Sequence, residues 1–477
     1  MIIEGRKVTG ITCNSKKVQK GYVFVAIEGL KVDGNKYIDE AISKGASVIF
    51  TEKDVQKDNI PIIKVKDARK KLALLLKEYY DNPTEKLFVI GVTGTNGKTT
   101  TVHLLDSIFN KAGISTALIG TLGIKIGNKY IKNNLTTPDA EYLYELFDEF
   151  VNKKVKVVIM EVSSHALKFS RTYGIEYDIA IHTNIEIDHM DIHDSFTEYV
   201  NTKKILFDSL KRNKLAIINT DDDNSSNLLE GNDRVLTITY GLNSKASVTA
   251  SSISETDKIS FNICIQRSIT TLSYNEIEPS EFKINTNLIG IHNIYNSLAA
   301  ISASLFYGIN IEDIQDALID FKGVPRRLEF IYDGDFTVID DFCHNPSSYQ
   351  AVLDTVRSLN YNNLIIVNSI RGNRGKDINY RNAEVLASWY STLNNPSIIL
   401  SLGNDVVKDK DKVTNEESNA YRKIFNKEEV RYEEYSNLKD SIRAAVKKAL
   451  KNDMILLIGP QGMNSGKEIL YEVLENY

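Results

Sequence analysis

The sequence is poor in the features that mark secreted, zinc-binding and membrane proteins. It has 3 cysteines in 477 residues (Cys13, Cys264 and Cys343), and they form no CxxC pair. Neither a disulfide framework nor a zinc knuckle is therefore expected. No apolar run reaches the roughly 18 residues of a membrane span, and the first residues lack the apolar core of a signal peptide. These absences predict a soluble, cytoplasmic protein with no membrane partner.

Positive charge is not in excess either. The chain has 58 lysines and arginines against 63 aspartates and glutamates, for a formal net charge of −5. A nucleic-acid-binding protein needs a basic surface, so no nucleic-acid partner is expected, although a local basic patch would be compatible with this total. The 8 prolines and the absence of low-complexity segments argue against a long disordered linker.

The strongest functional signal is the glycine-rich stretch 87–101, which reads LFVIGVTGTNGKTTT. The apolar run Leu87–Ile90 predicts a strand, and the periodic apolar residues after the turn predict a helix. Gly91, Gly94 and Gly97 would let backbone N–H groups approach phosphate oxygens, and the new helix would direct its positive end at them. The pattern predicts a phosphate-binding loop.

Two side chains of this loop have predicted roles. Lys98 would pair with the β- and γ-phosphates, and the Thr99 hydroxyl would bind magnesium. The spacing differs from the usual phosphate-loop signature, because Val92 stands where that signature has its first glycine. A glycine-rich strand–helix turn without a ligand is the alternative, and the elements predicted on either side of the loop favour phosphate binding.

The order of predicted strands and helices indicates an α/β protein with three domains. Residues 1–86 alternate short strands and helices and end at an Asn-Pro-Thr linker, which predicts a small α/β domain. Residues 87–325 contain long apolar strands, which are typical of a mostly parallel sheet buried between helices. Within them, residues 234–290 are rich in β-branched residues and are predicted to form antiparallel strands. Residues 326–477 resume the alternation and predict a Rossmann-like domain.

An acid and a histidine cluster follow two of the predicted central strands. Val155–Met160 runs into Glu161, and an acid at the end of a strand beside a phosphate loop is typical of Walker B magnesium sites. Beyond the strand Ile179–Thr183, His189 and His193 lie in a short acidic segment, although the chain has only 7 histidines. A zinc site and a solvated loop are the alternatives there. The phosphate loop favours magnesium, with His189 as a ligand or close to one.

Several motifs together resemble the ATP-dependent Mur ligases. They are TGTNGKTTT (93–101), Thr136-Thr137-Pro138-Asp139, Glu161-Val-Ser-Ser-His-Ala-Leu, Asp188-His-x-Asp-x-His and Asn293-x-x-Asn296. The stretch from Ile11 to Ala46 resembles the same family, and Asp341-Phe342-Cys343-His344-Asn345-Pro346 is a variation on a family motif, so the resemblance covers all three predicted domains. It implies a UDP-substrate-binding domain (1–86), a central ATP-binding ligase domain (87–325) and a C-terminal domain (326–477) that binds nucleotide and the incoming amino acid.

The resemblance also implies roles for individual residues. The catalytic residues would be Lys98, Glu161, His189 and Lys203. Magnesium would be held by Thr99, Glu161, His189 and Lys203. ATP would contact Gly94, Thr95, Asn96, Gly97, Lys98, Thr99, Thr100, Asn293, Asn296, Arg327 and Asp341. The UDP-muramoyl substrate would contact Ser15, Thr136, Thr137, Ser163 and Arg171.

Lys203 shows most clearly what the resemblance adds. It lies in the predicted helix Phe196–Leu210, and a lysine on a helix is ordinarily a solvated surface residue. The family resemblance implies instead that Lys203 is carbamylated. Addition of CO2 would turn its amine into a carboxylate-like magnesium ligand.

The implied reaction is amide-bond formation in peptidoglycan precursor synthesis, a step of cell-wall biogenesis that supports cell shape and division. A carboxylate of UDP-N-acetylmuramoyl-L-alanyl-D-glutamate would attack the γ-phosphate of ATP, and an amino acid would displace phosphate from the acyl phosphate. No nucleophilic side chain is required, which fits the lack of a Ser-His-Asp or Cys-His arrangement. The resemblance also suggests a monomer.

The C-terminal domain departs from the family where the amino acid is expected to bind. Ser401–Asp405 and Gly459–Asn464 match neither the diaminopimelate-adding nor the lysine-adding motifs, so the sequence does not assign the amine. The alternatives are a Mur-type ligase for another carboxylate and amine, a folylpolyglutamate-synthase-like ligase and a retired binding protein. The N-terminal domain and Thr136-Thr137-Pro138 disfavour the second alternative. The third is disfavoured by the presence of Lys98, Glu161, His189 and Lys203.

Overall fold

The structure, a computed structural model, describes residues 1–29, 32–127, 129–188, 190, 192–243, 245–255 and 258–475. The chain forms two compact units, each with a buried core of its own. The first comprises Met1–Thr249, Cys264–Ser280 and Asn296–Ala317. The second comprises Ala250–Ile263, Glu281–Tyr295 and Leu318–Tyr477.

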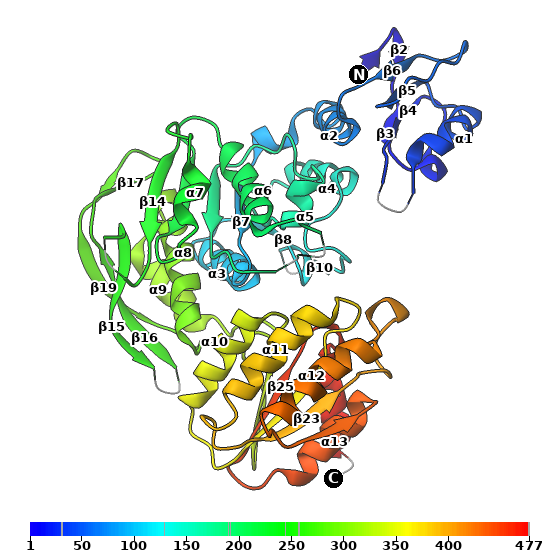
Figure 1. Ribbon diagram of the computed structural model, residues 1–477. Helices are drawn as coiled ribbons and strands as arrows, with labels where there is room; N and C mark the ends of the chain where they lie inside the picture. The colour runs from blue at the N-terminus through cyan, green and yellow to red at the C-terminus, as the bar shows by residue number, and fades with distance from the viewer. Residues whose placement is uncertain are drawn as a thin grey trace. The chain divides into compact units, whose positions relative to one another are not determined.

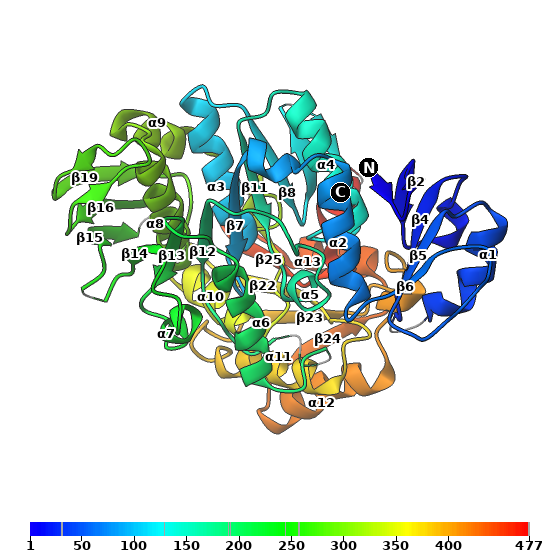
Figure 2. The same ribbon diagram turned by 90° about the horizontal axis from the view of Figure 1, so that it is seen from above.

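The first unit begins with a small parallel sheet. Its elements are β1 (Ile2–Ile3), β2 (Arg6–Lys7), β3 (Gly10–Thr12), η1 (Ser15–Lys17), β4 (Tyr22–Ala26), η2 (Gly34–Tyr37), α1 (Ile38–Ser43), β5 (Val48–Thr51), β6 (Ile62–Lys64), α2 (Ala68–Tyr79) and η3 (Pro83–Lys86). The strand order is β3-β4-β5-β6, and α1 and α2 lie on opposite faces (Figure 2). Both faces of β4 are therefore buried: Val23 and Val25 pack in the core that includes α2, and Phe24 packs in the core that includes α1.

A larger sheet of the first unit carries the phosphate loop. Its elements are β7 (Phe88–Thr93), α3 (Lys98–Lys111), β8 (Thr116–Gly120), β9 (Gly123–Ile126), β10 (Lys129–Ile131), α4 (Ala140–Asn152), β11 (Val157–Glu161), α5 (Ser164–Lys168), β12 (Ile179–His182), α6 (Phe196–Asp208), β13 (Leu215–Asn219), α7 (Ser225–Leu229) and β14 (Leu236–Tyr240). The order is β10-β9-β8-β11-β7-β12-β13-β14, parallel from β8 to β14. Helices α4 and α6 cover one face and α3 the other (Figure 1). The predicted parallel sheet between helices is confirmed.

One expectation for this sheet is wrong. The segment 234–240 was expected to be antiparallel, but β14 pairs with β13 in parallel, with Leu215 opposite Leu236. It also pairs in parallel with β15 (Val248–Glu255), with Tyr240 opposite Val248. The short helix α7 provides the crossover between β13 and β14, and parallel neighbours require such a crossover. Its five residues were too few to be recognised from the sequence.

The next elements lead from the central sheet to the C-terminal part of the chain. They are β16 (Ile259–Ile265), β17 (Ile269–Thr270), β18 (Glu276–Ile277), β19 (Ser280–Asn285), α8 (Ile291–Tyr307) and α9 (Ile311–Asp320). Strands β15, β16 and β19 are neighbours in that order. The sequence pattern of residues 293–306 and 311–320 predicts helices, and α8 and α9 span these ranges.

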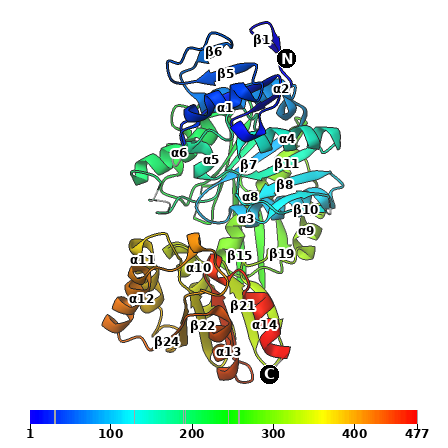
Figure 3. The ribbon, with the colours of Figure 1, turned by 90° about the vertical axis from the view of Figure 1, so that its right-hand side faces the viewer.

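The second unit contains a six-stranded sheet. Its elements are β20 (Glu329–Asp333), β21 (Thr337–Asp341), α10 (Pro346–Arg357), β22 (Leu364–Ser369), α11 (Lys376–Ser388), β23 (Ser397–Ser401), η4 (Asp409–Asp411), α12 (Asn415–Lys427), β24 (Tyr432–Tyr435), α13 (Leu438–Lys448), β25 (Met454–Ile458), η5 (Gln461–Met463) and α14 (Gly466–Glu475). The order is β20-β21-β25-β22-β23-β24, and only β20 pairs antiparallel. Helices α10 to α12 cover one face, and α13 and α14 cover the other (Figure 3).

The single tryptophan belongs to this second unit. Trp389 follows α11, is 8% exposed, and donates its indole N–H to Gln350 Oε1 at 2.8 Å. It packs in the core beneath α10 to α12. None of the helices in the described part of the chain is long and apolar enough to span a membrane.

Candidate active site

The phosphate loop between β7 and α3 is shaped by two glycines. Gly94 has φ 154°, and a Cβ there would lie 1.8 Å from Thr183 Oγ1. Gly97 has φ 84°, and a Cβ there would lie 2.4 Å from Asn296 Oδ1. Both positions combine a backbone conformation that favours glycine with a neighbour that leaves no room for a side chain. The predicted strand, loop and helix are confirmed.

Gly91 has a different reason to be glycine. It lies within β7, opposite Met160 of β11 and Ala180 of β12, so its backbone is part of the sheet. A Cβ at this position would lie 2.7 Å from the Tyr177 ring. The expectation that Gly91 lets a backbone N–H approach phosphate is therefore wrong, and close packing of an aromatic ring explains the residue.

The segment after β12 supports the loop from one side. Thr183 Oγ1 donates to the Asn96 carbonyl at 2.7 Å, and Asn184 Oδ1 accepts from the Asn96 N–H at 2.9 Å. Thr95 N–H donates to the Asn184 carbonyl at 2.7 Å, and the Thr95 hydroxyl lies 3.0 Å from Tyr199 Oη. The sequence interpretation gave no role to Thr183, Asn184 or Tyr199, because these contacts join residues about 90 to 100 positions apart.

Two of the predicted catalytic lysines meet at one carbonyl oxygen of the loop. Lys98 Nζ and Lys203 Nζ each donate to the Gly94 carbonyl at 2.8 Å. Lys203 is 1% exposed, and its Nζ lies 4.5 Å from the centre of the Tyr199 ring, one helical turn away on α6. The helix thus points this lysine inward, contrary to the usual position of a helical lysine.

The environment of Lys203 favours its uncharged form. Burial is the largest cause that lowers its pKa well below the ordinary lysine value, and the charge of Lys98 adds to it. Asp188 and Asp222 act in the opposite direction but do not outweigh these two causes. The structure therefore holds, beside the phosphate loop, a buried lysine whose pKa lies well below the ordinary value.

Thr99 and Glu161 are also brought together. Thr99 Oγ1 donates to Glu161 Oε2 at 3.1 Å, and Thr121 donates to the same carboxylate through its N–H at 2.8 Å and its hydroxyl at 3.1 Å. A hydroxyl and a carboxylate are oxygen donors of the kind that Mg²⁺ prefers. Among the described residues no three His, Cys, Asp or Glu side chains converge on a metal position, and His189 lies outside the described residues.

Most of the predicted substrate residues form a cluster next to the backbone of Glu161. Thr137 Oγ1 donates to the Glu161 carbonyl at 2.8 Å and accepts from the Ser163 N–H at 3.1 Å. Arg171 Nη1 donates to the Thr137 carbonyl at 3.1 Å. Thr136 precedes this group, and its hydroxyl lies 3.2 Å from that of Thr121. Ser15 is not part of this cluster and donates to Glu40 Oε2 at 2.7 Å.

The two predicted ATP contacts on α8 belong to different units. Asn296 belongs to the first unit, beside Gly97, and its Oδ1 lies 3.4 Å from Thr101 Oγ1. Asn293 belongs to the second unit and donates to the Ile289 carbonyl at 2.8 Å. The structure therefore places Asn296 at the loop, and the adenine role of Asn293 stays a prediction.

Arg327 and Asp341 lie together in the second unit. The Arg327 guanidinium is 5.0 Å from the centre of the Phe342 ring, and Asp341 Oδ2 accepts from the Leu328 N–H at 2.9 Å. Arg326 lies on the same ring at 5.1 Å, so Phe342 contacts two neighbouring guanidinium groups. The roles of Arg327 and Asp341 toward ATP stay predictions.

The regions that depart from the family motifs have structural roles within the second unit. Both carboxylate oxygens of Asp405 accept from backbone N–H groups at the start of α13, those of Leu438 at 2.7 Å and Lys439 at 3.2 Å. Asn464 Oδ1 accepts from Arg326 Nη1 at 2.6 Å. These side chains therefore stabilise the loops that follow β23 and β25.

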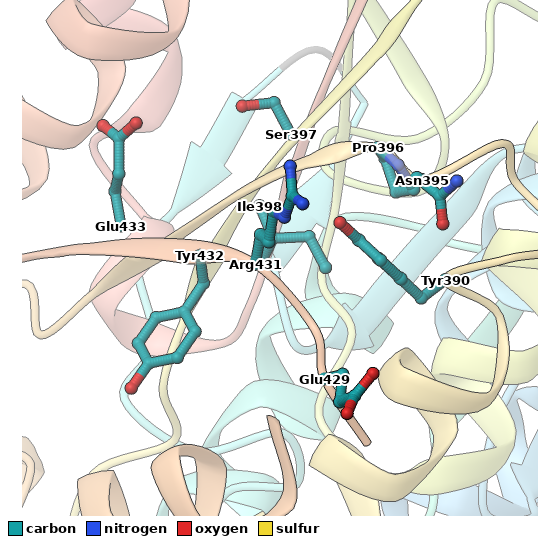
Figure 4. A pocket seen from close by; sticks show the side chains of 9 residues that line it. All are labelled: Tyr390, Asn395, Pro396, Ser397, Ile398, Glu429, Arg431, Tyr432 and Glu433. Atoms are coloured by element: carbon teal, nitrogen blue, oxygen red, sulfur yellow. The ribbon is translucent and has the colours of Figure 1, made fainter. Parts of the chain in front are cut away.

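A cavity of about 560 Å³ lies elsewhere in the second unit, at the amino ends of β23 and β24 (Figure 4). It is lined by Tyr390, Asn395, Pro396, Ser397, Ile398, Glu429, Arg431, Tyr432 and Glu433. Parallel α/β sheets bind ligands beyond the carboxyl ends of their strands, which is the opposite edge. The cavity contains none of the predicted site residues.

Comparisons with known proteins agree with this arrangement. Three family models match the chain: "Mur ligase family, catalytic domain" over residues 7–80, "Mur ligase middle domain" over 92–304, and "Mur ligase, glutamate ligase domain" over 326–460. A relative from Oceanobacillus iheyensis, UDP-N-acetylmuramoyl-L-alanyl-D-glutamate--2,6-diaminopimelate ligase, is 36% identical over 475 residues, covering 96% of this chain and 90% of the relative. The chain belongs to the Mur ligase family.

Solved structures show that this Mur ligase also has the family fold. A UDP-N-acetylmuramoyl-L-alanyl-D-glutamate--2,6-diaminopimelate ligase matches it with a TM-score of 0.67 at 23% identity, covering 95% of this chain and 90% of the other. The MurF ligase of Thermotoga maritima, solved in complex with ADP, matches with a TM-score of 0.63 at 19% identity, covering 99% and 98%. The three-part α/β architecture expected from the sequence is confirmed.

Proposed function

We propose that this Mur ligase joins an amino acid to UDP-N-acetylmuramoyl-L-alanyl-D-glutamate at the expense of ATP. The observation that carries the proposal is the convergence of Lys98 and Lys203 on the Gly94 carbonyl, next to the Thr99–Glu161 contact. The relatives named as ligases for this acceptor support the choice of substrate. The protein would act as a cytoplasmic monomer.

The chemistry is phosphoryl transfer followed by acyl transfer. The substrate carboxylate attacks the γ-phosphorus of ATP, which forms a C–O–P bond and releases ADP. The amine then attacks the acyl carbon, loses a proton, and expels inorganic phosphate. The protein's part is positioning and charge neutralisation: Lys98 would hold the phosphoryl oxygens, and the amino end of α3, which begins at Lys98, would be directed at them.

Magnesium would be bound by Thr99, Glu161 and, as a carbamate, Lys203, with His189 as a further ligand. The hydroxyl and carboxylate oxygens that meet at Glu161 suit this hard cation. When bound, magnesium supplies charge neutralisation at the phosphates. The lowered pKa of Lys203 supports the carbamate, because only the neutral form of an amine has the lone pair that adds to CO2.

Each domain would bind a different substrate or part of one. Residues 1–86 would bind the UDP moiety, with Ser15 among the contacts, and residues 87–325 would bind ATP and the dipeptide carboxylate. Thr136, Thr137, Ser163 and Arg171 would hold the muramoyl peptide, since three of them form one cluster next to the backbone of Glu161. Residues 326–477 would bind the incoming amino acid and, through Arg327 and Asp341, part of the nucleotide.

A ligation assay tests the proposal. The protein is incubated with ATP, magnesium and the muramoyl dipeptide, a panel of amino acids is offered, and phosphate release and product mass are followed. We expect amine-dependent phosphate release and a product heavier by one amino-acid residue. Lys98→Ala and Lys203→Ala should abolish turnover, with bicarbonate unable to restore the second variant, while Lys204→Ala on the same helix serves as the matched control. Phosphate release with no amide product would contradict the proposal.

A further inference from the structure

The loop after β22 is held by one buried carboxylate from a different helix. Glu417, on α12, is 1% exposed. Its Oε1 accepts from the N–H groups of Arg374 and Gly375, both at 2.8 Å, and its Oε2 accepts from the Asn373 N–H at 3.0 Å. Asn373 and Gly375 have φ of 53° and 91°, and successive N–H groups in such a turn form an anion-binding concavity, which here contains a side chain of the same protein.

The same carboxylate also begins α12. Its Oε2 accepts from the Thr414 N–H at 2.9 Å and from the Thr414 hydroxyl at 3.1 Å, while Thr414 Oγ1 accepts from the Glu417 N–H at 3.3 Å. This reciprocal pair is a capping box. One charged group therefore ties the loop after β22 to the first turn of α12, with hydrogen bonds strengthened by the carboxylate charge.

The loop lies at the carboxyl end of β22, the edge at which open α/β sheets bind their ligands. It carries three basic residues, Arg371, Arg374 and Lys376. Arg371 Nη1 donates to the His344 carbonyl at 2.8 Å, and Arg374 Nη2 lies 3.5 Å from Asp411 Oδ1. Guanidinium groups at this edge are suited to a carboxylate ligand, and the amino acid to be joined carries one.

We propose that Glu417 is a positioning residue for the amino-acid substrate: by fixing residues 371–376, it holds the loop arginines that bind the carboxylate of the incoming amino acid. The inference rests on the proposed ligase function and adds to it the group that organises the amine site. Glu417 itself touches no reacting atom. Its removal leaves three backbone N–H groups of the loop, and that of Thr414, without their acceptor and lets the arginines move.

Steady-state kinetics of Glu417→Gln test this role. The glutamine keeps the volume, but its amide nitrogen cannot accept from the loop N–H groups. We expect the KM for the amino acid to rise about tenfold or more, while the KM values for ATP and for the muramoyl dipeptide stay within about twofold. Glu416→Gln, an exposed neighbour on the same helical turn, is the matched control and should leave all three KM values unchanged.

A second variant covers the case in which Glu417→Gln folds poorly. Glu417→Ala leaves space for a small anion, and added formate should lower its KM for the amino acid, whereas chloride at equal ionic strength should not. Hydrogen exchange of the Asn373, Arg374 and Gly375 amides should be faster in both variants than in the wild type.

The outcomes separate the two proposals. Equal losses for all three substrates without formate rescue, or an unchanged KM for the amino acid, would overturn the role of Glu417. Unchanged amide exchange in an otherwise active enzyme would do the same. A wild-type protein that joins no amino acid to the muramoyl dipeptide would instead overturn the proposed function, and with it any role of Glu417 in substrate positioning.

Discussion

Lys98 and Lys203 donate to the same carbonyl but differ in their surroundings. Lys98 opens α3 at a partly exposed position, as expected of a residue that meets a phosphate from solution. Lys203 is buried against Tyr199 and has a pKa well below that of an ordinary lysine. Among the residues that the structure describes, no carboxylate lies within ion-pair distance of this buried amine, so it does not help the fold and its presence at the phosphate loop points to chemistry.

The first prediction concerns that amine. Lys203→Met replaces it with an apolar chain of similar length, and we expect ligase activity to fall by about a thousandfold because the carbamate proposed to bind magnesium cannot form. We expect the free energy of unfolding to stay equal or to increase by about 1 kcal/mol, because burial and Lys98 both disfavour the charged form of the native lysine. Urea unfolding and the ligation assay measure the two effects. Marked destabilisation would show that the lysine supports the fold.

A second prediction concerns the glycine that both lysines contact. In Gly94→Ala the new methyl group would meet Thr183 Oγ1, so the loop must move, and we expect activity to fall by about a hundredfold or more. Gly113→Ala is the matched control, since its φ of 73° is also left-handed but no atom lies within 4 Å of the added carbon. Calorimetric titration with ADP should show weaker binding for the first variant only. If both variants bind ADP as tightly as the wild type, the expected clash between residue 94 and Thr183 does not occur.

At the scale of strands and helices, sequence patterns located most elements. The apolar runs at Tyr22–Ala26, Leu215–Asn219 and Met454–Ile458 predict strands, because a strand buried on both faces is a continuous apolar run. They match β4, β13 and β25 residue for residue. The direction of β14 was not predictable in this way, because direction depends on the connection and not on the strand itself. For a similar reason, local sequence did not predict the contacts of the candidate site that join distant segments.

Local sequence identified the parts of the site that lie close together in the chain. The glycine pattern predicted the phosphate loop, and the position of Glu161 after the strand Val155–Met160 marked it as a candidate site residue. Contacts from distant segments could not be derived, among them those of Thr183 and Glu417, because nothing in the local pattern of either residue shows what it will meet. The inward direction of Lys203 was expected only from the family resemblance.

A third prediction concerns β21 and the loop after β25. Arg326 donates through Nε to Asp340 at 3.1 Å and through Nη2 to the Gly459 carbonyl at 2.6 Å, which joins the two elements. Burial raises the pKa of Asp340 from 3.8 to about 6, even though the Arg326 guanidinium lowers it. The folded protein therefore keeps the Asp340 proton at pH values where the unfolded chain has lost it.

The sign of the pH dependence follows from this difference. The contribution of Asp340 to stability is present below about pH 4 and is lost as the pH rises through 6, and it changes by at most about 3 kcal/mol. We expect the unfolding free energy of the wild type, relative to that of Asp340→Asn, to fall over this range. Urea unfolding of both proteins at several pH values measures it, and a constant or rising difference would contradict the raised pKa.

At the scale of the whole molecule, the N-terminal sheet is joined to the central sheet by a carboxylate. Glu141, at the start of α4, accepts from Thr12 Oγ1 at 3.1 Å and from the Cys13 N–H at 2.5 Å. These contacts connect residues about 130 positions apart within the first unit. They lie directly before Ser15, the predicted contact of the UDP substrate.

The fourth prediction tests that connection. In Glu141→Ala two donors of the N-terminal sheet lose their acceptor, so we expect faster hydrogen exchange over residues 10–17 and destabilisation of about 1 kcal/mol. The KM for the muramoyl dipeptide should rise, while the KM for ATP stays unchanged. Glu145→Ala, exposed one turn further along α4, is the control. Identical exchange in both variants would show that the contact is dispensable.

The lone indole of this protein has a practical consequence. Trp389 follows the last residue of α11, at the end away from the Glu417-bound loop, and it donates its indole N–H to Gln350. Its emission therefore comes from the second unit alone, with no other tryptophan in the chain to obscure it. Unfolding of the second unit can then be read as a change in colour or intensity of native fluorescence, without any attached dye.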